Sequence, residues 1–114
     1  MTGRFSENLT PPYYAVIFAN QRTAQGESAY EQAAEQLAEI AQDMPGYLGL
    51  ESTRDDTGFG ITVSYWETEE AIRNWKMHAD HAAAQESGKT DWYAHYELRV
   101  AKVERAYSGP QGRN

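Results

Sequence analysis

Residues 58–81 read GFGITVSYWETEEAIRNWKMHADH, and this segment decides the fold because it joins a strand directly to a helix. Its first half alternates between two sets of residues with a period of two and is rich in β-branched and aromatic side chains. This pattern is typical of a β-strand whose two faces meet different surroundings. One face would carry Phe59, Ile61, Val63 and Tyr65, and the other Gly60, Thr62, Ser64 and Trp66.

The second half of the segment has the signals of an amphipathic helix. Thr68 can accept a hydrogen bond at the helix start, and Glu69 and Glu70 place negative charge where the helix dipole favours it. His78 follows the apolar stripe and His81 lies near its edge, so both imidazoles could face a pocket or line its rim. The stripe, which should pack on the sheet, comprises Ala71, Ile72, Trp75 and Ala79.

The composition describes a small acidic domain without cysteine. A chain of 114 residues fits one domain and can bury roughly two thirds of the surface that it would expose unfolded. The formal charge of −7, with no basic run, makes nucleic acid a poor partner. The absence of cysteine excludes disulfides, thiolate catalysis and metal sites built on cysteine.

The sequence gives no sign of a membrane span or an export signal. No apolar run approaches the roughly 20 residues that span a bilayer, and the first residues, MTGRFSENLTPP, lack the hydrophobic stretch of a signal peptide. We therefore expect a cytoplasmic protein without a membrane partner. Its three Trp and eight Tyr residues exceed what solubility requires and indicate a subunit contact, a ligand pocket, or both.

The first part of the chain predicts an arm, a strand and a helix. Residues 1–12 end in Pro-Pro and should form an extended arm. Residues 13–20, YYAVIFAN, are apolar on both faces, which is typical of a central strand. A capping box of Ser28 and Glu31 begins the next helix, which the Pro-Gly pair at 45–46 ends. Its apolar stripe comprises Tyr30, Ala33, Ala34, Leu37, Ile40, Ala41 and Met44.

Two further strands complete the pattern. Residues 47–54, YLGLESTR, form the first, and a tight turn at residues 55–58, DDTG, leads into the strand already described. Residues 91–105 predict a long final strand. Its apolar side changes from Ala101 onward, so we expect its far end to leave its own sheet and meet a second molecule. Residues 108–114 should be a flexible tail.

The predicted order is strand, helix, strand, strand, helix, strand, which is the α+β, ferredoxin-like βαββαβ pattern. A four-stranded antiparallel sheet would then carry both helices on one face. The opposite face holds aromatic and aliphatic residues from the first and third strands, and such a patch needs cover in water. We therefore expect a homodimer, a dimeric α/β barrel whose sheets pack face to face. The domain would span residues 13–107, between the arm and the tail.

Four segments of the chain carry a family resemblance. The most specific are MPGYLGLEST after the first helix and GITVSYWETEEAIRNW through the centre, and the others are YYAVIFANQRT and WYAHYELRVAKVERAY near the two ends. Together they resemble the antibiotic biosynthesis monooxygenase family over residues 13–107. The resemblance implies the same fold, the same dimer and a monooxygenase activity. Relatives include haem-degrading oxygenases and cofactor-free oxygenases that form quinones.

The haem-degrading branch of this family matches the chain only in part. Its second-helix Trp matches Trp75, and its polar residue late in the first strand matches Asn20. The iron-binding His of that branch follows the Trp by about nine or ten positions, where this chain has Ala84 and Gln85. The resemblance therefore makes haem degradation the weaker alternative and implies no cofactor.

The cofactor-free branch implies a small aromatic partner, a polyphenol or hydroquinone-like substrate. Once deprotonated, such a molecule can itself reduce O₂, so the protein need only bind it, accept a proton and stabilise negative charge. His78 or His81 would be the base, because an ordinary imidazole pKa of about 6.5 suits this role. Asn20 and the Trp75 indole would donate hydrogen bonds to the substrate. The aromatic walls would be Phe18, Tyr65 and Trp66.

Each candidate also has a plain structural interpretation. Trp75 could simply be core, and Asn20 could cap the adjacent loop. His78 and His81 could share a metal, but no carboxylate with suitable spacing completes that site, so no metal site is predicted. The main alternative function is a non-catalytic dimeric module, for ligand binding or stress response, that holds a small ligand unchanged.

Overall fold

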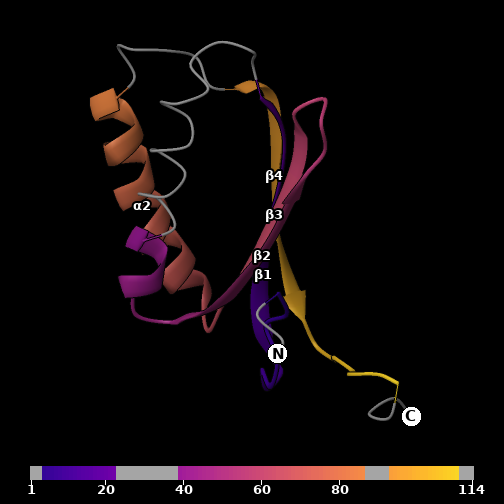
Figure 1. Cartoon of the computed structure of the whole chain (residues 1–114). Helices are drawn as coiled ribbons and strands as arrows, with labels where there is room; N and C mark the ends of the chain where they lie inside the picture. The colour runs from indigo at the N-terminus through magenta and orange to yellow at the C-terminus, as the bar shows by residue number, and fades with distance from the viewer. Residues whose placement is uncertain (1–3, 23–38, 87–92, 111–114) are drawn as a thin grey trace.

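A computed structural model describes residues 4–22, 39–86 and 93–110 of the chain. Side chains are described for all of these except residues 80–86 and 93–94. Figure 1 shows one sheet with helices on a single face. Among the described residues, no helix is both long and apolar enough to cross a membrane.

Four antiparallel strands form the sheet in the order β2-β3-β1-β4, so the apolar first strand is central as predicted. This is the expected α+β, ferredoxin-like arrangement. Residues 39–43 of the predicted first helix are helical, and the remainder of that prediction, residues 28–38, lies outside the described residues. The other elements are β1 (Tyr13–Arg22), β2 (Tyr47–Arg54), β3 (Phe59–Trp66), α2 (Glu69–Glu86) and β4 (Tyr93–Val103).

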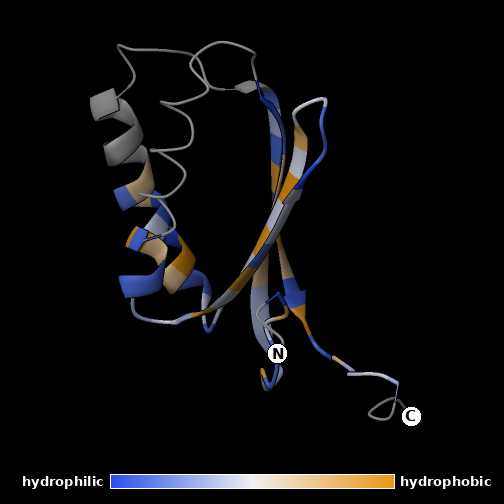
Figure 2. Ribbon diagram, in the orientation of Figure 1, coloured by the Kyte–Doolittle hydropathy of each residue, from blue (hydrophilic) through white to orange (hydrophobic). Residues whose placement is uncertain are grey.

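The strand register sorts side chains onto two faces, because successive residues of a strand point to opposite sides. Tyr14 pairs with Trp66 and Asn20 with Gly60, so all four belong to the face that α2 covers, here called the helix-side face. Figure 2 shows hydrophobic and hydrophilic residues alternating along the strands. The opposite face, here called the open face, includes Tyr13, Ala15, Ile17, Ala19, Phe59, Ile61, Val63 and Tyr65.

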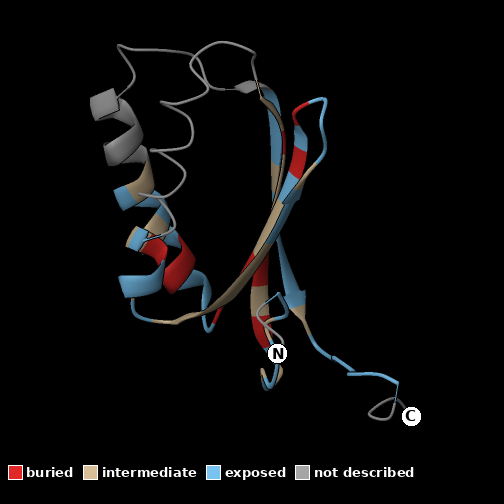
Figure 3. Ribbon diagram, in the orientation of Figure 1, coloured by how far each residue is buried: buried red, intermediate tan, exposed pale blue. Residues whose placement is uncertain are grey.

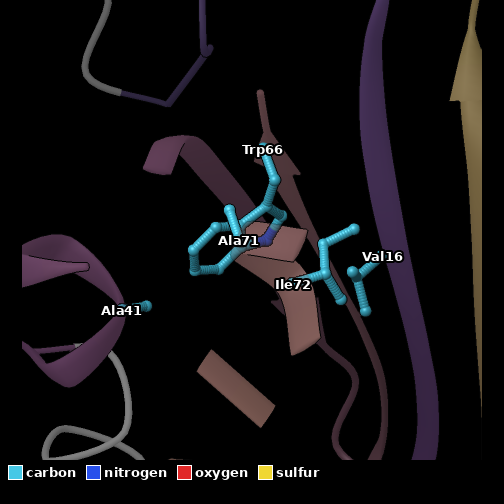
Figure 4. Packing of buried hydrophobic residues seen from close by; sticks show 5 residues of the cluster. All are labelled: Val16, Ala41, Trp66, Ala71 and Ile72. Carbon is cyan, nitrogen blue, oxygen red and sulfur yellow. The ribbon is translucent and has the colours of Figure 1, made fainter. Parts of the chain in front are cut away.

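The core lies where the first turns of α2 meet the sheet. Trp66 is 0% exposed and Val16 is 2% exposed, and both pack with Ala71 and Ile72 of α2 (Figure 4). Ala41, from the other described helical run, completes the cluster. Figure 3 shows buried residues of both layers at this end, and a smaller buried group near the hairpin between β2 and β3. Removal of this apolar surface from water, at about 25 cal/mol per Å², holds the helix against the sheet.

Two glycines with a left-handed backbone close the connections around β2. Gly46 has a φ of 88° after the helical run ends, and a Cβ there would lie 2.7 Å from the Cβ of Ala71. Gly58 has a φ of 94° and ends the predicted turn, with its amide donating to the Asp55 carbonyl at 3.2 Å. An L side chain is strained in this conformation, so both turns require glycine.

Strand β4 differs from its predicted course at its far end. β4 stays paired with β1 as far as Val103, which lies opposite Tyr13, so the chain leaves the sheet only from residue 104 onward and later than predicted, and the contact of this end with a second molecule stays a prediction. Ala101 likewise pairs with Ala15. Central strand β1 offers backbone partners along its whole length, so the backbone groups of β4 are satisfied within the chain. From Ala101 onward the apolar residues of β4 therefore lie on the open face, while the strand remains in the same sheet.

The N-terminal arm does more than lead into β1. The Ser6 amide donates to the Glu51 carboxylate at 3.0 Å, and the Ser6 hydroxyl donates to the Leu50 carbonyl at 3.4 Å. A Cβ at Gly49 would collide with Ser6, so the missing side chain makes this contact possible. Glu51 pairs with Val63, so the arm covers part of the open face beside β2.

Candidate functional site

Asn20 ends the apolar run of β1 as a buried polar residue on the helix-side face. Its side chain is 2% exposed. The amide nitrogen donates to the Phe18 carbonyl at 3.3 Å, and the amide oxygen accepts from Arg54 Nη2 at 2.7 Å. A buried polar side chain without partners is unfavourable, so Asn20 is held in one orientation by its neighbours.

The Asn20–Arg54 contact crosses β3 at a glycine. Gly60 is the register partner of both Arg54 on β2 and Asn20 on β1, so the three positions form one row across the sheet. A Cβ at Gly60 would lie 2.9 Å from Cζ of Arg54. Arg54 Nη1 also donates to the Gly58 carbonyl. A glycine inside a strand marks close approach of another group, and here that group is the guanidinium.

Aromatic and hydroxyl groups extend this end of the helix-side face. The rings of Phe18 and Tyr96 lie 5.4 Å apart at 55°. Leu98 of β4 is the register partner of Phe18. Ser52 and Thr62, from β2 and β3, share a hydrogen bond of 2.7 Å. This part of the face therefore offers ring surfaces beside hydrogen-bonding groups, which is how sites for aromatic ligands are composed.

Two tryptophans occupy the other end of the helix-side face. The rings of Trp66 and Trp75 lie 5.6 Å apart at 37°. The Trp66 indole donates to the Ser64 hydroxyl at 2.9 Å. The Trp75 Nε1 atom is buried and has no hydrogen-bond partner among the described residues. A buried indole N–H normally has a partner, so Trp75 is an unsatisfied buried donor within the described part of the chain.

The two ends of this face are well separated. Trp66 is level with Tyr14, and Asn20 is six residues further along β1. At about 3.3 Å per residue, that spacing corresponds to roughly 20 Å. The structure therefore brings Asn20 next to Phe18, and Trp66 next to Trp75, but it places these two pairs at opposite ends of one face. A ligand that contacts both pairs must extend along β1.

His78 lies on α2 one turn beyond Trp75, and its side chain is exposed. Its Nδ1 atom is 2.9 Å from the Asn74 carbonyl, which only accepts hydrogen bonds. Nδ1 must therefore carry the proton, which leaves Nε2 with a lone pair in the neutral ring. His81 also belongs to α2, and its side chain lies outside the described part.

Tyr65 does not join the other predicted site residues. It lies on the open face, where its hydroxyl donates to Glu51 at 2.7 Å and its ring meets Tyr13 edge to face at 5.7 Å. Burial raises the pKa of the Tyr65 hydroxyl, and the hydrogen bond and negative charge of Glu51 raise that pKa further. Tyr65 directly precedes Trp66 in β3, and neighbouring residues of a strand point to opposite faces of the sheet, so the two side chains cannot share a face.

Sequence reasoning missed Arg54 as a site residue. Arg54 is the last residue of β2, and in the sequence it is simply a charged residue before a turn. Only the strand register places its guanidinium over Gly60 and beside Asn20. The available signal was Gly60 itself, the small residue inside an otherwise bulky strand.

A surface recess at the first turn of α2 is a poorer candidate site. Its lining includes Glu67 and Glu70, whose negative charges would repel an anionic ligand. It also lacks Asn20, Phe18 and Trp75. We therefore place the candidate site on the helix-side face.

The donor set does not fit the haem ligation of the family's haem-degrading branch. The helix positions expected to supply the iron ligand hold Ala84 and Gln85. Neither side chain offers the imidazole, thiolate, thioether or phenolate that holds haem iron in proteins.

Comparison with known proteins identifies relatives in sequence. The profile of the family described as "Antibiotic biosynthesis monooxygenase" matches residues 13–87. Protein YqjZ of Bacillus subtilis (strain 168), described as uncharacterized, is 47% identical over 100 residues. That alignment covers 88% of this chain and 87% of YqjZ.

Solved structures share the fold at low sequence identity. SnoaB from Streptomyces nogalater, a cofactor-independent oxygenase, has a TM-score of 0.64 at 10% identity, with 84% of this chain and 97% of SnoaB covered. A variant of MhuD with two manganese protoporphyrin IX molecules bound per active site has a TM-score of 0.65 at 22% identity, with 84% and 99% covered. Because the family profile matches well over half of its length, this chain belongs to the antibiotic biosynthesis monooxygenase family.

Proposed function

We propose that this protein is a cofactor-independent monooxygenase that oxidises a fused-ring phenolic substrate bound along the helix-side face. The observation that carries this proposal is the buried Trp75 indole N–H, which has no partner among the described residues. A donor held in this way stabilises an oxyanion better than it stabilises a neutral group. The membership of the family supports the reaction class.

The separation of the two ends of the site supports an extended substrate. Asn20 and Phe18 lie at one end, and Trp75 with Trp66 at the other. A linear three-ring molecule such as anthrone reaches further along the face from either end than a single hydroquinone ring does.

The proposed reaction balances without a further reductant. A base takes a proton from the methylene carbon of anthrone, and the resulting anion passes electrons to O₂ as a carbon–oxygen bond forms. Loss of the second methylene proton and cleavage of the O–O bond then give anthraquinone and water. One oxygen atom enters the product and the other enters water. The protein supplies proton acceptance, orientation and stabilisation of negative charge.

His78 is the proposed base, with His81 as the alternative from the same helix. The Nδ1 proton of His78 is committed to the Asn74 carbonyl, so its Nε2 can take a proton from a substrate. The side chain of His78 is exposed in the single chain, and a bound substrate would bring it out of water.

A homodimer is proposed through the open face. Phe59 is 44% exposed and Ile61 is 37% exposed there, and Ile17 and Val63 continue the apolar surface. A second copy of the same face would remove this patch from water in a two-fold arrangement.

Oxygen consumption with anthrone in air tests the proposed activity. We expect protein-dependent formation of anthraquinone with one O₂ used per product, and a much slower reaction with hydroquinone. Binding of anthrone without turnover would instead identify a non-catalytic module and overturn the proposal. A Soret shift on addition of haem, followed by ring opening, would point to the haem-degrading branch.

A further inference from the structure

We propose that Arg54 is a positioning residue that orients the Asn20 carboxamide so that its N–H, and not its oxygen, faces the substrate. The orientation itself stands on the contacts of this chain, and its catalytic meaning rests on the function proposed above. Nothing in the reaction chemistry alone would assign a role to Arg54.

The chemistry of the guanidinium fixes which end of the amide it meets. Arg54 only donates hydrogen bonds, so the atom of Asn20 that lies 2.7 Å from Nη2 has to be the oxygen. The reversed amide would set two donors against each other. With Oδ1 committed to Arg54, the NH₂ group points away from the guanidinium. One of its hydrogens reaches the Phe18 carbonyl, and the other has no partner among the described residues.

Arg54 is itself held at a second point. Its Nη1 donates to the Gly58 carbonyl while its Nη2 donates to Asn20, so two hydrogen bonds fix the orientation of the planar guanidinium. Gly60 leaves the room for that plane, since a Cβ there would lie 2.9 Å from Cζ. The cation therefore lies in a fixed place between β2 and β1, as a positioning group must.

The charge of Arg54 also strengthens the amide as a donor. A charge-assisted bond to Oδ1 polarises the carboxamide and makes its N–H groups more positive. Asn20 is 2% exposed, so water does not screen this effect. An N–H of this kind favours a phenolate or peroxide oxygen over a neutral one.

The side-chain amide of Asn20 can be followed directly by NMR in ¹⁵N-labelled protein. Its pair of signals is assigned by its loss in Asn20→Ala. In Arg54→Met we expect this pair to shift and to exchange with solvent at least tenfold faster, with Arg54→Lys in between. Arg73→Met, which removes an exposed guanidinium on α2, should leave the pair unchanged. An unchanged Asn20 pair in Arg54→Met would overturn the proposal.

Asn20→Asp separates positioning from a purely structural role. The carboxylate keeps the link to Arg54 as an ion pair but removes the N–H donor. Because the carboxylate also loses the bond to the Phe18 carbonyl, we expect a Tm at pH 7 below that of the wild type but above that of Asn20→Ala, together with at least a tenfold lower kcat for anthrone. A Tm as low as that of Asn20→Ala would show that the link is absent and would overturn the proposal.

A double-mutant cycle completes the test. If Arg54 acts through Asn20, then Arg54→Met lowers kcat in the wild type but lowers it no further in Asn20→Ala. Independent losses would show that Arg54 touches the substrate and would overturn the positioning role. If the wild type does not oxidise anthrone, the proposed function fails, while the NMR and Tm results still decide the role of Arg54.

Discussion

The rings of Trp66 and Trp75 lie 5.6 Å apart, yet their indole N–H groups have different surroundings. Trp66 donates to the buried Ser64 hydroxyl at 2.9 Å, whereas the buried Nε1 of Trp75 has no partner among the described residues. The first arrangement satisfies a buried donor within the core, and the second leaves a buried donor without a partner in the described part of the chain. Trp75 is for this reason the tryptophan to which the proposed function gives a role.

Replacement of each tryptophan by Phe should separate stability from activity. Trp75→Phe keeps one packed ring and removes the unpartnered N–H without breaking a hydrogen bond, so we expect a smaller loss of stability than in Trp66→Phe and a kcat for anthrone lower by about a hundredfold. Trp66→Phe removes the partner of Ser64 and should cost about 1–3 kcal/mol of unfolding free energy. Urea denaturation and oxygen uptake measure the two effects. Equal stability losses in both variants would contradict this assignment.

The core against α2 should be sensitive to truncation. Ile72 is 5% exposed among the core residues, so Ile72→Ala should lower the unfolding free energy by about 2–4 kcal/mol. Met77 on the same helix is 68% exposed, and Met77→Ala should change it by less than about 0.5 kcal/mol. Chemical denaturation of the Ile72→Ala and Met77→Ala variants measures the two unfolding free energies. Similar effects in both variants would mean that α2 does not pack as described.

A charge on the open face should separate the proposed dimer. Ile61→Lys would bury an unpaired ammonium between two apolar faces, so we expect the protein to sediment as a monomer. Met77→Lys, on the exposed side of α2, is the control and should leave the assembly unchanged. A wild-type protein that is already monomeric, or an Ile61→Lys variant that stays dimeric, would refute the proposed interface.

The hairpin turn should give a pH-dependent contribution to stability. The Thr57 hydroxyl, followed by backbone amides of the turn, holds the pKa of the Asp55 carboxyl below its ordinary value of 3.8. Because the folded-state pKa is lower than the unfolded one, the carboxylate stabilises the fold above the unfolded pKa. That contribution is lost as the pH falls through the folded pKa.

Asp55→Ala tests this contribution. Its Tm should lie below the wild-type Tm at neutral pH, and the difference should narrow steadily as the pH falls below the ordinary Asp pKa of about 4. Asp56→Ala, at the neighbouring exposed position, should show a smaller difference at neutral pH. A Tm difference between the wild type and Asp55→Ala that stays constant across the acidic range would show that the Asp55 contacts do not depend on ionisation.

The order of strands and helices was predictable because each element shows a local periodicity of apolar residues in the sequence. The alternation from Phe59 to Trp66 predicted β3 with its observed bounds, and YLGLESTR predicted β2. Thr68 accepts from the Ala71 amide at 3.0 Å, as its predicted place at the start of α2 requires. The course of β4 near Val103 was not predictable, since pairing with β1 depends on partners far away in the sequence.

The candidate site residues follow from the sequence one by one, but their arrangement does not. Asn20 and Trp75 were named through the family resemblance, and their catalytic roles stay predictions; the structure adds that Asn20 is bonded to Arg54 and that the Trp75 N–H is buried. Tyr65 was grouped with Trp66 although adjacent strand residues face opposite sides, and the register places it on the open face. Arg54 was overlooked because its meaning depends on Asn20, which lies 34 positions away in the sequence.

The sequence by itself determined the order of elements, the two faces of β3, the polarity of α2 and the family, because short-range periodicity and motif spacing encode each of them. Only the tertiary structure decided which polar groups meet. The Asn20–Arg54 contact over Gly60 and the difference between the indoles of Trp66 and Trp75 both arise from strand register and helix packing. Those long-range pairings are fixed when backbone hydrogen bonds and core burial are satisfied together across the whole sheet.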